Sequence, residues 1–423
     1  MLSIQIFRNQ KEKILAGLAK KNFKNISIVE DIIATDEHKR QLQQQSDQIA
    51  ATINTASKSI GQLMAQGKKE EAEAQKNEIA GLKEKAKDLN QQLNEQEERL
   101  FQLLVQLPNL PHESVPNGTS AEDNEIMRQG GTIPELTQEM LPHWELTQKY
   151  KLIDFELGTK ITGSGFPVYI NKGAKLQRAL IQYFLDYNTA AGYTEYMPPL
   201  MVNEDTAYGT GQLPDKEGQM YHVTEDGFYL IPTAEVPLTN IYRDAILSAD
   251  QLPVKMTAYT PCFRREAGSY GKDVRGLNRL HQFDKVEIVQ ICAPEMSYEK
   301  LEEMVEHVEQ LLKNLELPYR ILRLCGGDMS FTSALTYDFE VYSAAQQRWL
   351  EVSSVSNFET FQTNRMKIRS KDENGKTQLL HSLNGSSLAL PRIVACLLEN
   401  KQSADGIRLP EVLTKYFGDS MIN

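Results

Sequence analysis

A long heptad pattern between Ile28 and Leu103 constrains the fold of this chain more than any other feature of its sequence. Apolar residues recur there at alternating steps of three and four, which is the spacing of a coiled coil. The pattern breaks at Gly67 and then restarts, and this favours an antiparallel hairpin over one long rod. The apolar positions are Ile28, Ile32, Leu42, Ile49, Ile53, Ile60 and Leu63 before the break, and Ala72, Ile79, Leu82, Ala86, Leu89, Leu93, Leu100 and Leu103 after it.

The predicted arm is long but carries little net charge. At about 1.5 Å per residue each helix would extend for about 50–60 Å, and Pro108 would end the second one. Between Glu37 and Leu100 there are ten Lys or Arg and eleven Asp or Glu residues. Such a hairpin is by itself more typical of a dimerisation or spacer element than of a nucleic-acid surface. The seam also contains polar residues: Lys39, Ser46, Gln75 and Gln96.

The composition is that of an ordinary soluble globular protein. The chain has 423 residues, which suggests about two to three domains, with 40% hydrophobic and 24% charged residues. A net charge of −11 argues against a protein that coats nucleic acid through its overall field, and it leaves room for a local basic patch.

The N-terminal sequence and the cysteines favour the cytoplasm. A short apolar run precedes the first charges, which is the reverse of a secretory signal. No run approaches the ~20 apolar residues that a membrane span needs. The four cysteines lie far apart without a CxxC pair, so we expect reduced thiols rather than disulfides or a zinc site.

The chain divides by composition into three parts. Residues 1–107 hold the arm and, before it, a short strand or coil that leads into a basic helix. Residues 108–131 are rich in Pro, Gly, Asn and Ser and are predicted to be a linker. Residues 132–423 have the texture of a compact mixed domain.

In this last part, strand-like runs follow one another without a βαβ rhythm, which predicts an α+β domain on an antiparallel sheet flanked by helices. The expected helices are His143–Tyr150, Gly173–Ala191, Tyr298–Leu315 and a last one at Ala389–Gln402. The expected strands include Lys255–Cys262, Lys285–Cys292, Tyr337–Val341, Arg348–Ser354 and Met366–Arg369.

Within this domain, the stretch from Thr260 to Glu287 is typical of a long hairpin with a Gly-rich basic loop. Fixed arginines beside a basic loop suit a bound polyphosphate and a second polyanion. A solvated surface hairpin is the alternative. The GxxxxGK[ST] phosphate-binding loop of common nucleotide hydrolases is absent from the sequence.

Four local clusters point further when they are taken together. They are Gly192–Pro199 after a long helix, the hairpin with Arg264 and Phe283, Glu351–Ser354, and LNGSSLALPR at 383–392. In this order they strongly resemble the signature motifs of class II aminoacyl-tRNA synthetases. With the arm, Thr233-Ala234-Glu235 and HQFDKVE at 281–287, nearly the whole chain looks like the seryl-tRNA synthetase family. One small departure is Gly165, where many relatives carry an arginine.

The resemblance implies a reaction in which the serine carboxylate attacks the α-phosphorus of ATP, and it implies the residues that assist. Arg264 would bridge the α-phosphate and the carboxylate, and Arg392 would meet the γ-phosphate; both are expected to be catalytic. Phe283 would stack on adenine and Glu266 would accept from its amino group. Glu351 and Ser354 would be ligands of Mg²⁺. Further ATP contacts are implied at Arg265, Leu280, Val352 and Ser353.

The resemblance also implies a serine pocket and a tRNA surface. The serine pocket would consist of Thr233, Ala234, Glu235, Arg264, Glu287, Asn384 and Ser386. The acceptor stem of tRNA would contact Lys272, Arg275 and Arg279, and the arm would reach the outer part of the tRNA. No His or Lys stands out as a general base for the transfer step.

The implied partners are ATP, L-serine, tRNA(Ser) and a second copy of the chain, with tRNA(Sec) left open as another acceptor. The homodimer is expected because the helix from Gly173 and the run to Pro199 resemble the motif that builds the class II dimer. Two other readings remain: a related ligase that charges a non-tRNA acceptor, and a non-catalytic coiled-coil protein. An intact set of Arg264, Glu351 and Arg392 weighs against the second of these.

Overall fold

A computed structural model describes most of the chain and divides it into two compact units. The described residues are 1–135, 140–267, 275–372 and 374–423. One unit comprises residues 2–19 and 23–108, and the other comprises Met1, residues 20–22 and residues 109–423. In the described residues no helix combines the length and the apolar character that crossing a membrane requires.

The N-terminal unit is entirely helical in its regular structure, with α1 (Ile4–Asn9), α2 (Lys11–Lys20), α3 (Ile28–Ala65) and α4 (Lys69–Leu104). The basic helix expected near the start is α2, but helix α1 stands where a short strand or coil was expected before it. The side chain of Ser3 caps α1 by accepting from the backbone N–H of Gln5, and Phe7 is buried on its inner face. A capped turn with a buried aromatic residue is enough to fix a helix this short.

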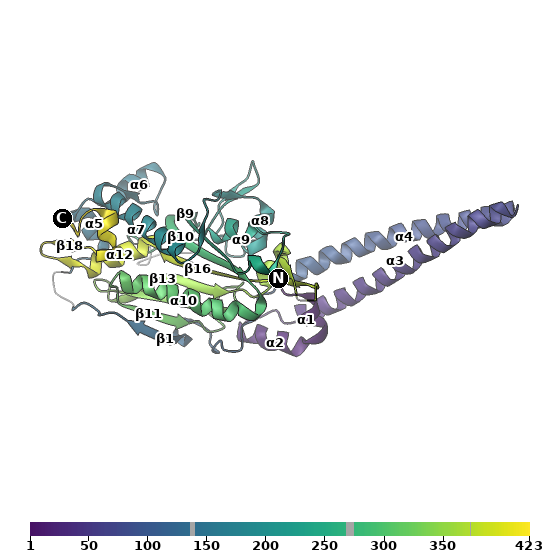
Figure 1. Cartoon of the computed structure of the whole chain (residues 1–423), viewed down its shortest axis with the longest axis horizontal. Helices are drawn as coiled ribbons and strands as arrows, with labels where there is room; N and C mark the ends of the chain where they lie inside the picture. The colour runs from purple at the N-terminus through teal and green to yellow at the C-terminus, as the bar shows by residue number, and fades with distance from the viewer. Residues whose placement is uncertain (136–139, 268–274, 373) are drawn as a thin grey trace. The chain divides into compact units, whose positions relative to one another are not determined.

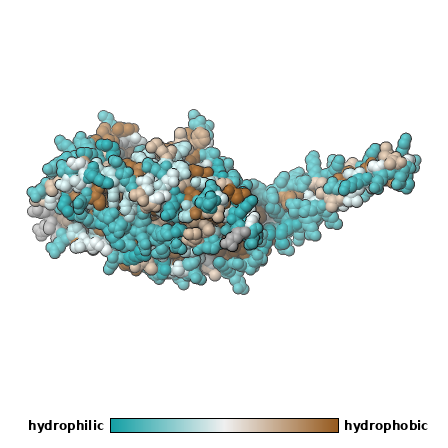
Figure 2. Space-filling model, viewed as in Figure 1, coloured by the Kyte–Doolittle hydropathy of each residue, from teal (hydrophilic) through white to brown (hydrophobic). Residues whose placement is uncertain are grey.

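The predicted hairpin is confirmed: α3 and α4 run antiparallel and pack along their length (Figure 1). The break falls at Gly67, whose φ of +79° is the left-handed conformation that favours glycine. Polar seam residues pair across the helices, with Ser46 donating to Asn90 at 3.2 Å and Ser59 to Gln75 at 2.7 Å. The visible outer face of both helices is largely hydrophilic, as Figure 2 shows. The apolar cluster between them consists of Leu42, Ile49 and Leu89, with Ile53, Leu82, Ala86 and Leu93 packed against it.

The second unit is built on an eight-stranded sheet in the order β1-β11-β12-β13-β16-β10-β9-β4. All neighbours in it are antiparallel except β4, which pairs in parallel with β9. The α+β prediction is therefore confirmed. The strands are β1 (Glu125–Gly130), β4 (Thr194–Glu195), β9 (Val254–Phe263), β10 (Gln282–Cys292), β11 (Tyr319–Arg323), β12 (Leu335–Ser343), β13 (Arg348–Asn357) and β16 (His381–Ala389).

Three helices pack on this sheet and share one apolar core with it: α7 (Asn171–Ala190), α10 (Ser297–Asn314) and α12 (Leu390–Asn400). Leu180 and Phe184 of α7, and Leu301 of α10, are fully buried in that core. Shorter helices surround them: α5 (His143–Lys149), α6 (Phe155–Ile161), α8 (Glu204–Thr210), α9 (Glu235–Asn240), α11 (Phe361–Met366) and α13 (Glu411–Phe417).

Four small sheets complete this unit: β2 (Ile153–Asp154) with β3 (Val168–Tyr169); β5 (Met201–Val202), β7 (Phe228–Leu230) and β6 (His222–Val223); β15 (Thr377–Leu379), β14 (Arg369–Lys371) and β8 (Ile246–Leu247); and β17 (Gln402–Ser403), β18 (Gly406–Arg408) and β19 (Met421–Ile422).

Two predictions from sequence were wrong in this unit, and one strand was not predicted. The expected strand at 366–369 is divided, because Met366 ends α11 and Lys367 takes a left-handed φ of +52° before β14 begins. The expected last helix is followed by α13 and by the β17–β19 sheet. The Pro- and Gly-rich stretch 108–131 contains β1, which covers the edge strand β11. Composition did not reveal β1, because a short edge strand needs little apolar sequence.

Candidate active site

A cavity of about 560 Å³ opens over the central strands of the large sheet. Its walls come from β10, β13 and β16, from the residues after β9, and from the first turns of α9 and α12. Most residues predicted for catalysis and binding line it. They are Thr233, Glu235, Arg264, Glu266, Arg279, Leu280, Phe283, Glu287, Glu351, Val352, Ser353, Ser354, Asn384, Ser386 and Arg392.

One end of the cavity holds two buried carboxylates. Glu287 on β10 is 2% exposed, and its Oε2 accepts from the Thr233 hydroxyl at 3.0 Å and pairs with Lys285 Nζ at 2.8 Å. Glu235 begins α9, and its Oε1 accepts from the Gln362 amide at 2.6 Å. A site with two buried acids and a single lysine can accept one more cation, which is the charge of an α-ammonium group.

The environment of Glu235 changes its ionisation. Burial, and then the charge of Glu287, raise the pKa of Glu235 to about 7. The hydrogen bond from Gln362 and the charge of Lys285 act in the opposite direction and do not compensate fully. A carboxyl group with a pKa near neutrality in a cleft marks a functional site, because a bound cation would restore its ionised form.

The strands β13 and β16 approach each other closely at a glycine. Gly385 lies on β16 between Asn384 and Ser386, and a Cβ at this position would lie 2.8 Å from Cγ2 of Val355. Any larger residue would push β16 away from β13. The glycine therefore keeps the Asn384 and Ser386 side chains at the cavity wall.

The other end of the cavity is basic and aromatic. Arg264 follows β9, donates through Nε to the Pro232 carbonyl at 3.4 Å, and places its Cζ 5.2 Å from the centre of the Phe283 ring. Glu266 adopts a left-handed φ of +49°, and its Oε2 accepts from Arg279 Nε at 2.6 Å. An arginine over an aromatic face next to a second ion pair can hold a planar base and phosphate oxygens.

Arg392 enters from the first turn of α12. Its Nε donates to the Asn278 carbonyl at 3.1 Å, and its Nη1 donates to the Glu351 carbonyl at 2.6 Å. The Glu351 carboxylate lies 3.7 Å from the same nitrogen. Two backbone carbonyls thus orient the guanidinium toward the cavity before any ligand arrives.

The segment from Glu351 to Ser354 on β13 contributes oxygen atoms of different kinds. Ser353 is buried and its hydroxyl donates to the Ser386 carbonyl at 2.7 Å, so this hydroxyl joins β13 to β16. Ser354 is opposite Asp338 on β12. Burial, and then the charge of Glu351, raise the pKa of Asp338, and its Oδ1 has no hydrogen-bond partner among the described residues.

Three of the predicted residues that the structure describes do not line the cavity. Ala234 is fully buried in an apolar cluster that includes Leu238 and Met256. Arg265 is exposed, and its backbone N–H bonds to the Gln219 carbonyl at 2.9 Å. Arg275 lies over the Trp144 ring at 4.5 Å. Lys272, with Gly268 and Gly271, falls outside the described residues.

Sequence reasoning missed some cavity residues. Lys285 lies two residues before Glu287 on β10 and forms the ion pair with it. Residues two apart on a strand share one face, and this period could have indicated Lys285. Asn278 and Gln219 also line the cavity, and nothing in their local sequence pointed to it.

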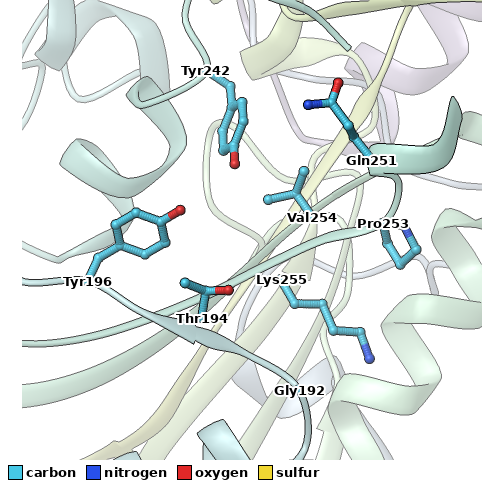
Figure 3. A pocket seen from close by; sticks show the side chains of 8 residues that line it. All are labelled: Gly192, Thr194, Tyr196, Tyr242, Gln251, Pro253, Val254 and Lys255. Atoms are coloured by element: carbon cyan, nitrogen blue, oxygen red, sulfur yellow. The ribbon is translucent and has the colours of Figure 1, made fainter. Parts of the chain in front are cut away.

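A second, smaller cavity of about 350 Å³ lies at the edge of the sheet near β4. Figure 3 shows Thr194 and Lys255 along its lower side and the rings of Tyr196 and Tyr242 above them. Apolar side chains nearby are open to solvent, with Met197 92% and Met201 50% exposed. Residues of this size and exposure are typical of a surface that another chain covers.

Comparisons with known proteins agree with this geometry. A model of the "tRNA synthetase class II core domain (G, H, P, S and T)" matches residues 221–401, and one of the "Seryl-tRNA synthetase N-terminal domain" matches residues 1–111. The antiparallel sheet and its charged cavity thus define the catalytic domain of a class II aminoacyl-tRNA synthetase.

The relatives narrow the assignment. A serine–tRNA ligase of Salinibacter ruber is 50% identical over 100% of this chain and 99% of its own length, and one of Neisseria meningitidis serogroup B is 47% identical over 99% and 98%. The seryl-tRNA synthetase of Pyrococcus horikoshii complexed with ATP superimposes with a TM-score of 0.93 at 32% identity, covering 100% of this chain and 99% of that one. The chain belongs to the seryl-tRNA synthetase family.

Proposed function

We propose that the cavity is where this serine–tRNA ligase activates L-serine with ATP and passes the seryl group to tRNA(Ser). The observation that carries the proposal is one cavity with two buried acids at one end and two oriented arginines at the other. Both reactants of the first step are anions at their reacting centres. The site must therefore neutralise charge and hold the carboxylate in line with the α-phosphorus.

At the acidic end, Glu287 and Glu235 bind the α-ammonium group of serine. Thr233, Asn384 and Ser386 supply small polar groups that can hydrogen-bond the substrate hydroxyl. Alanine bound in place of serine would leave those groups unpaired, and this penalty discriminates strongly against alanine as a substrate. Threonine adds only a methyl group and must be excluded by the shape of the pocket. Ala234 stays a predicted contact of serine.

At the basic end, Arg264 bridges the serine carboxylate and the α-phosphate, and Arg392 meets the γ-phosphate. Phe283 stacks on adenine, with Glu266, Leu280 and Val352 around the base. Arg265 and Ser353 stay as predicted ATP contacts through their backbone, since one side chain is exposed and the other is bonded to β16. The adenylate would then be attacked by the terminal ribose hydroxyl of tRNA.

The ATP-dependent reaction is expected to use Mg²⁺, and the segment from Glu351 to Ser354 on β13 offers oxygen ligands for this ion. Glu351 and Ser354 both line the cavity and are hard oxygen donors of the type that Mg²⁺ prefers. In the described part of the chain no group of three or more His, Cys, Asp or Glu residues could hold a metal by itself. Phosphate oxygens would therefore complete the coordination, and the ion would offset their charge.

The pKa of Glu235 leads to a testable pH dependence. Serine's ammonium group is bound best by the ionised carboxylate, which is lost as pH falls below about 7. We expect the KM for serine in pyrophosphate exchange to rise roughly tenfold for each pH unit below that value.

The contribution of Glu235 to the free energy of unfolding depends on pH in the opposite direction. Because the pKa is raised from 4.5, folding is favoured at lower pH and becomes less so as pH rises from 4.5 toward 7.

Glu235→Gln separates this effect from other titrations. The variant should bind serine more weakly at every pH and show a KM that no longer rises in acid. The same steep rise in the variant would contradict the role of Glu235.

The arm is proposed to bind the outer part of tRNA(Ser), and the acceptor stem to meet Arg275, Arg279 and Lys272. Replacing residues 47–89 with a short Gly-Ser turn tests the arm, because Ser46 and Asn90 already touch and can close a shorter hairpin. Charging of tRNA should fall by about tenfold or more, as several contacts worth about 1 kcal/mol each are lost. Serine-dependent exchange should remain within about twofold, since no residue of this segment lines the cavity. Unchanged charging would contradict the role of the arm.

The exposed apolar residues near β4 support a homodimer, as the resemblance of the helix from Gly173 implies. The cytoplasm fits the four free cysteines of the described chain.

We also propose the division into residues 1–107 for tRNA binding, 108–131 as connection and 132–423 for catalysis. Whether tRNA(Sec) is a second acceptor is a matter for the charging assay.

Two assays together test the whole proposal. Serine-dependent pyrophosphate exchange measures activation, and charging of total tRNA measures transfer. Both activities are expected. Exchange without charging would select a ligase for another acceptor, and the absence of exchange would refute the catalytic assignment.

A further inference from the structure

A buried histidine supports the stretch from Arg275 to Leu280 at the edge of the cavity. His143, the first residue of α5, is 0% exposed, and its Nε2 accepts from the backbone N–H of Leu277 at 2.8 Å. Gly276 has a φ of +67°, and a Cβ there would lie 2.2 Å from the same nitrogen. The histidine thus approaches the backbone so closely that only glycine fits beside it.

The other side of His143 is fixed by Glu399 of α12. The Nδ1 atom lies 2.7 Å from Glu399 Oε1, and the backbone N–H of His143 donates to the same oxygen at 2.9 Å. The Ser343 hydroxyl donates to the second oxygen. Although burial raises it, these hydrogen bonds with His143 hold the pKa of Glu399 below its ordinary value. An ionised Glu399 places the imidazole proton on Nδ1 and leaves Nε2 as an acceptor.

A second route joins Glu399 to the same stretch. Gln346 donates to Glu399 Oε1 at 3.0 Å and accepts from the Asn278 side chain at 3.0 Å. The Asn278 carbonyl accepts from Arg392 Nε at 3.1 Å. Leu277, Asn278 and Leu280 are cavity residues. The network therefore ends on the ATP side of the cavity.

We propose that His143 is a positioning residue for ATP. This inference rests on the proposed function. The Nε2 atom of His143 holds Leu277 and Asn278 in the positions where they border the base and orient Arg392. His143 touches no substrate. Its effect reaches the nucleotide through one backbone hydrogen bond, with Glu399 fixing the tautomer that can accept it.

A matched pair of variants tests the proposal. His143→Gln places an amide oxygen near the position of Nε2 and can keep the bond to Leu277. His143→Asn places an amide nitrogen near the position of Nδ1, so it keeps the bond to Glu399 and loses the one to Leu277. In serine-dependent exchange, the asparagine variant should raise the KM for ATP by about tenfold and leave the KM for serine within about twofold. The glutamine variant should raise the KM for ATP by less than about threefold.

The controls make the outcome decisive. Thermal unfolding of both variants reports loss of packing, which would affect them alike. If His143→Asn does not fold, Gly276→Ala replaces it, because its Cβ would displace the same nitrogen and should raise the same KM. An equal effect of both histidine variants, or a joint rise in the KM for ATP and serine, would overturn the inference. No exchange by the unaltered chain would refute the proposed function and this inference with it.

Discussion

Glu287→Gln is expected to lower serine-dependent pyrophosphate exchange by about 10²–10³-fold while the chain stays folded. The loss follows because the ammonium group would keep only Glu235, whose pKa of about 7 leaves it partly protonated, and losing a buried charge partner costs about 3–4 kcal/mol. Glutamine keeps an oxygen that can accept from Thr233 and Lys285, so the cavity retains its shape. The exchange rate at saturating ATP measures the effect.

Alanine would be a poorer choice at this position. Glu287→Ala leaves Lys285, which is 7% exposed, with neither a counter-charge nor the hydrogen-bond acceptor that glutamine retains, and a buried charge left in this way destabilises the fold by about 3–5 kcal/mol. Glu309→Gln provides a matched control, since Glu309 is buried as well, at 7% exposed against 2% for Glu287, and pairs with Arg128 away from the cavity. Equal exchange in Glu287→Gln and the control would refute the serine pocket.

Arg264→Lys is expected to lower the turnover number of exchange by about 10²–10³-fold with a small change in stability. Lysine keeps the charge, but it lacks the planar fork that can bind a carboxylate and a phosphate together. It also loses the placement of the guanidinium over Phe283. Single-turnover formation of the adenylate measures the chemical step directly.

The matched control is Arg320→Lys on β11. Arg320 is another half-buried arginine that lies over an aromatic ring, with its Cζ 4.8 Å from the centre of the Trp349 ring. It lies outside the residues that line the cavity. Its exchange rate should stay within about twofold of that of the unaltered chain, because it contacts neither reactant. Similar losses in both variants would show that packing, and not phosphate binding, explains the effect of Arg264.

The sequence predicted the architecture where local patterns are strong. Heptads located α3 and α4, and alternating runs located the long strands of the large sheet. It failed at β1 and at Met366, because a short edge strand and a left-handed turn depend on partners that lie far away in the chain. The hydrophobic period of a segment indicates whether that segment is a helix or a strand. It carries little information on which distant strand pairs with it.

The site was predictable mainly through motifs. The structure brings Arg264, Glu287 and Arg392 to one cavity, although more than a hundred residues separate the first from the last. Their supporting partners could not be found in the same way. His143 and Glu399 are 0% exposed, and their sequence neighbourhoods give no sign that they meet. A hydrogen bond between distant elements becomes visible only when the fold is known.

The sparse seam of the arm has a mechanical consequence. In α3, all of whose residues are described, Ile49 is the last buried position. Beyond it the hairpin is held by two buried residues of α4, Ala72 and Ile79, and by partly buried and polar contacts such as Ser59 with Gln75. Few apolar contacts mean a low local free energy of opening. The distal arm should therefore exchange its amide hydrogens much faster than α12. The far end of the arm can then change its conformation to fit the surface of a binding partner.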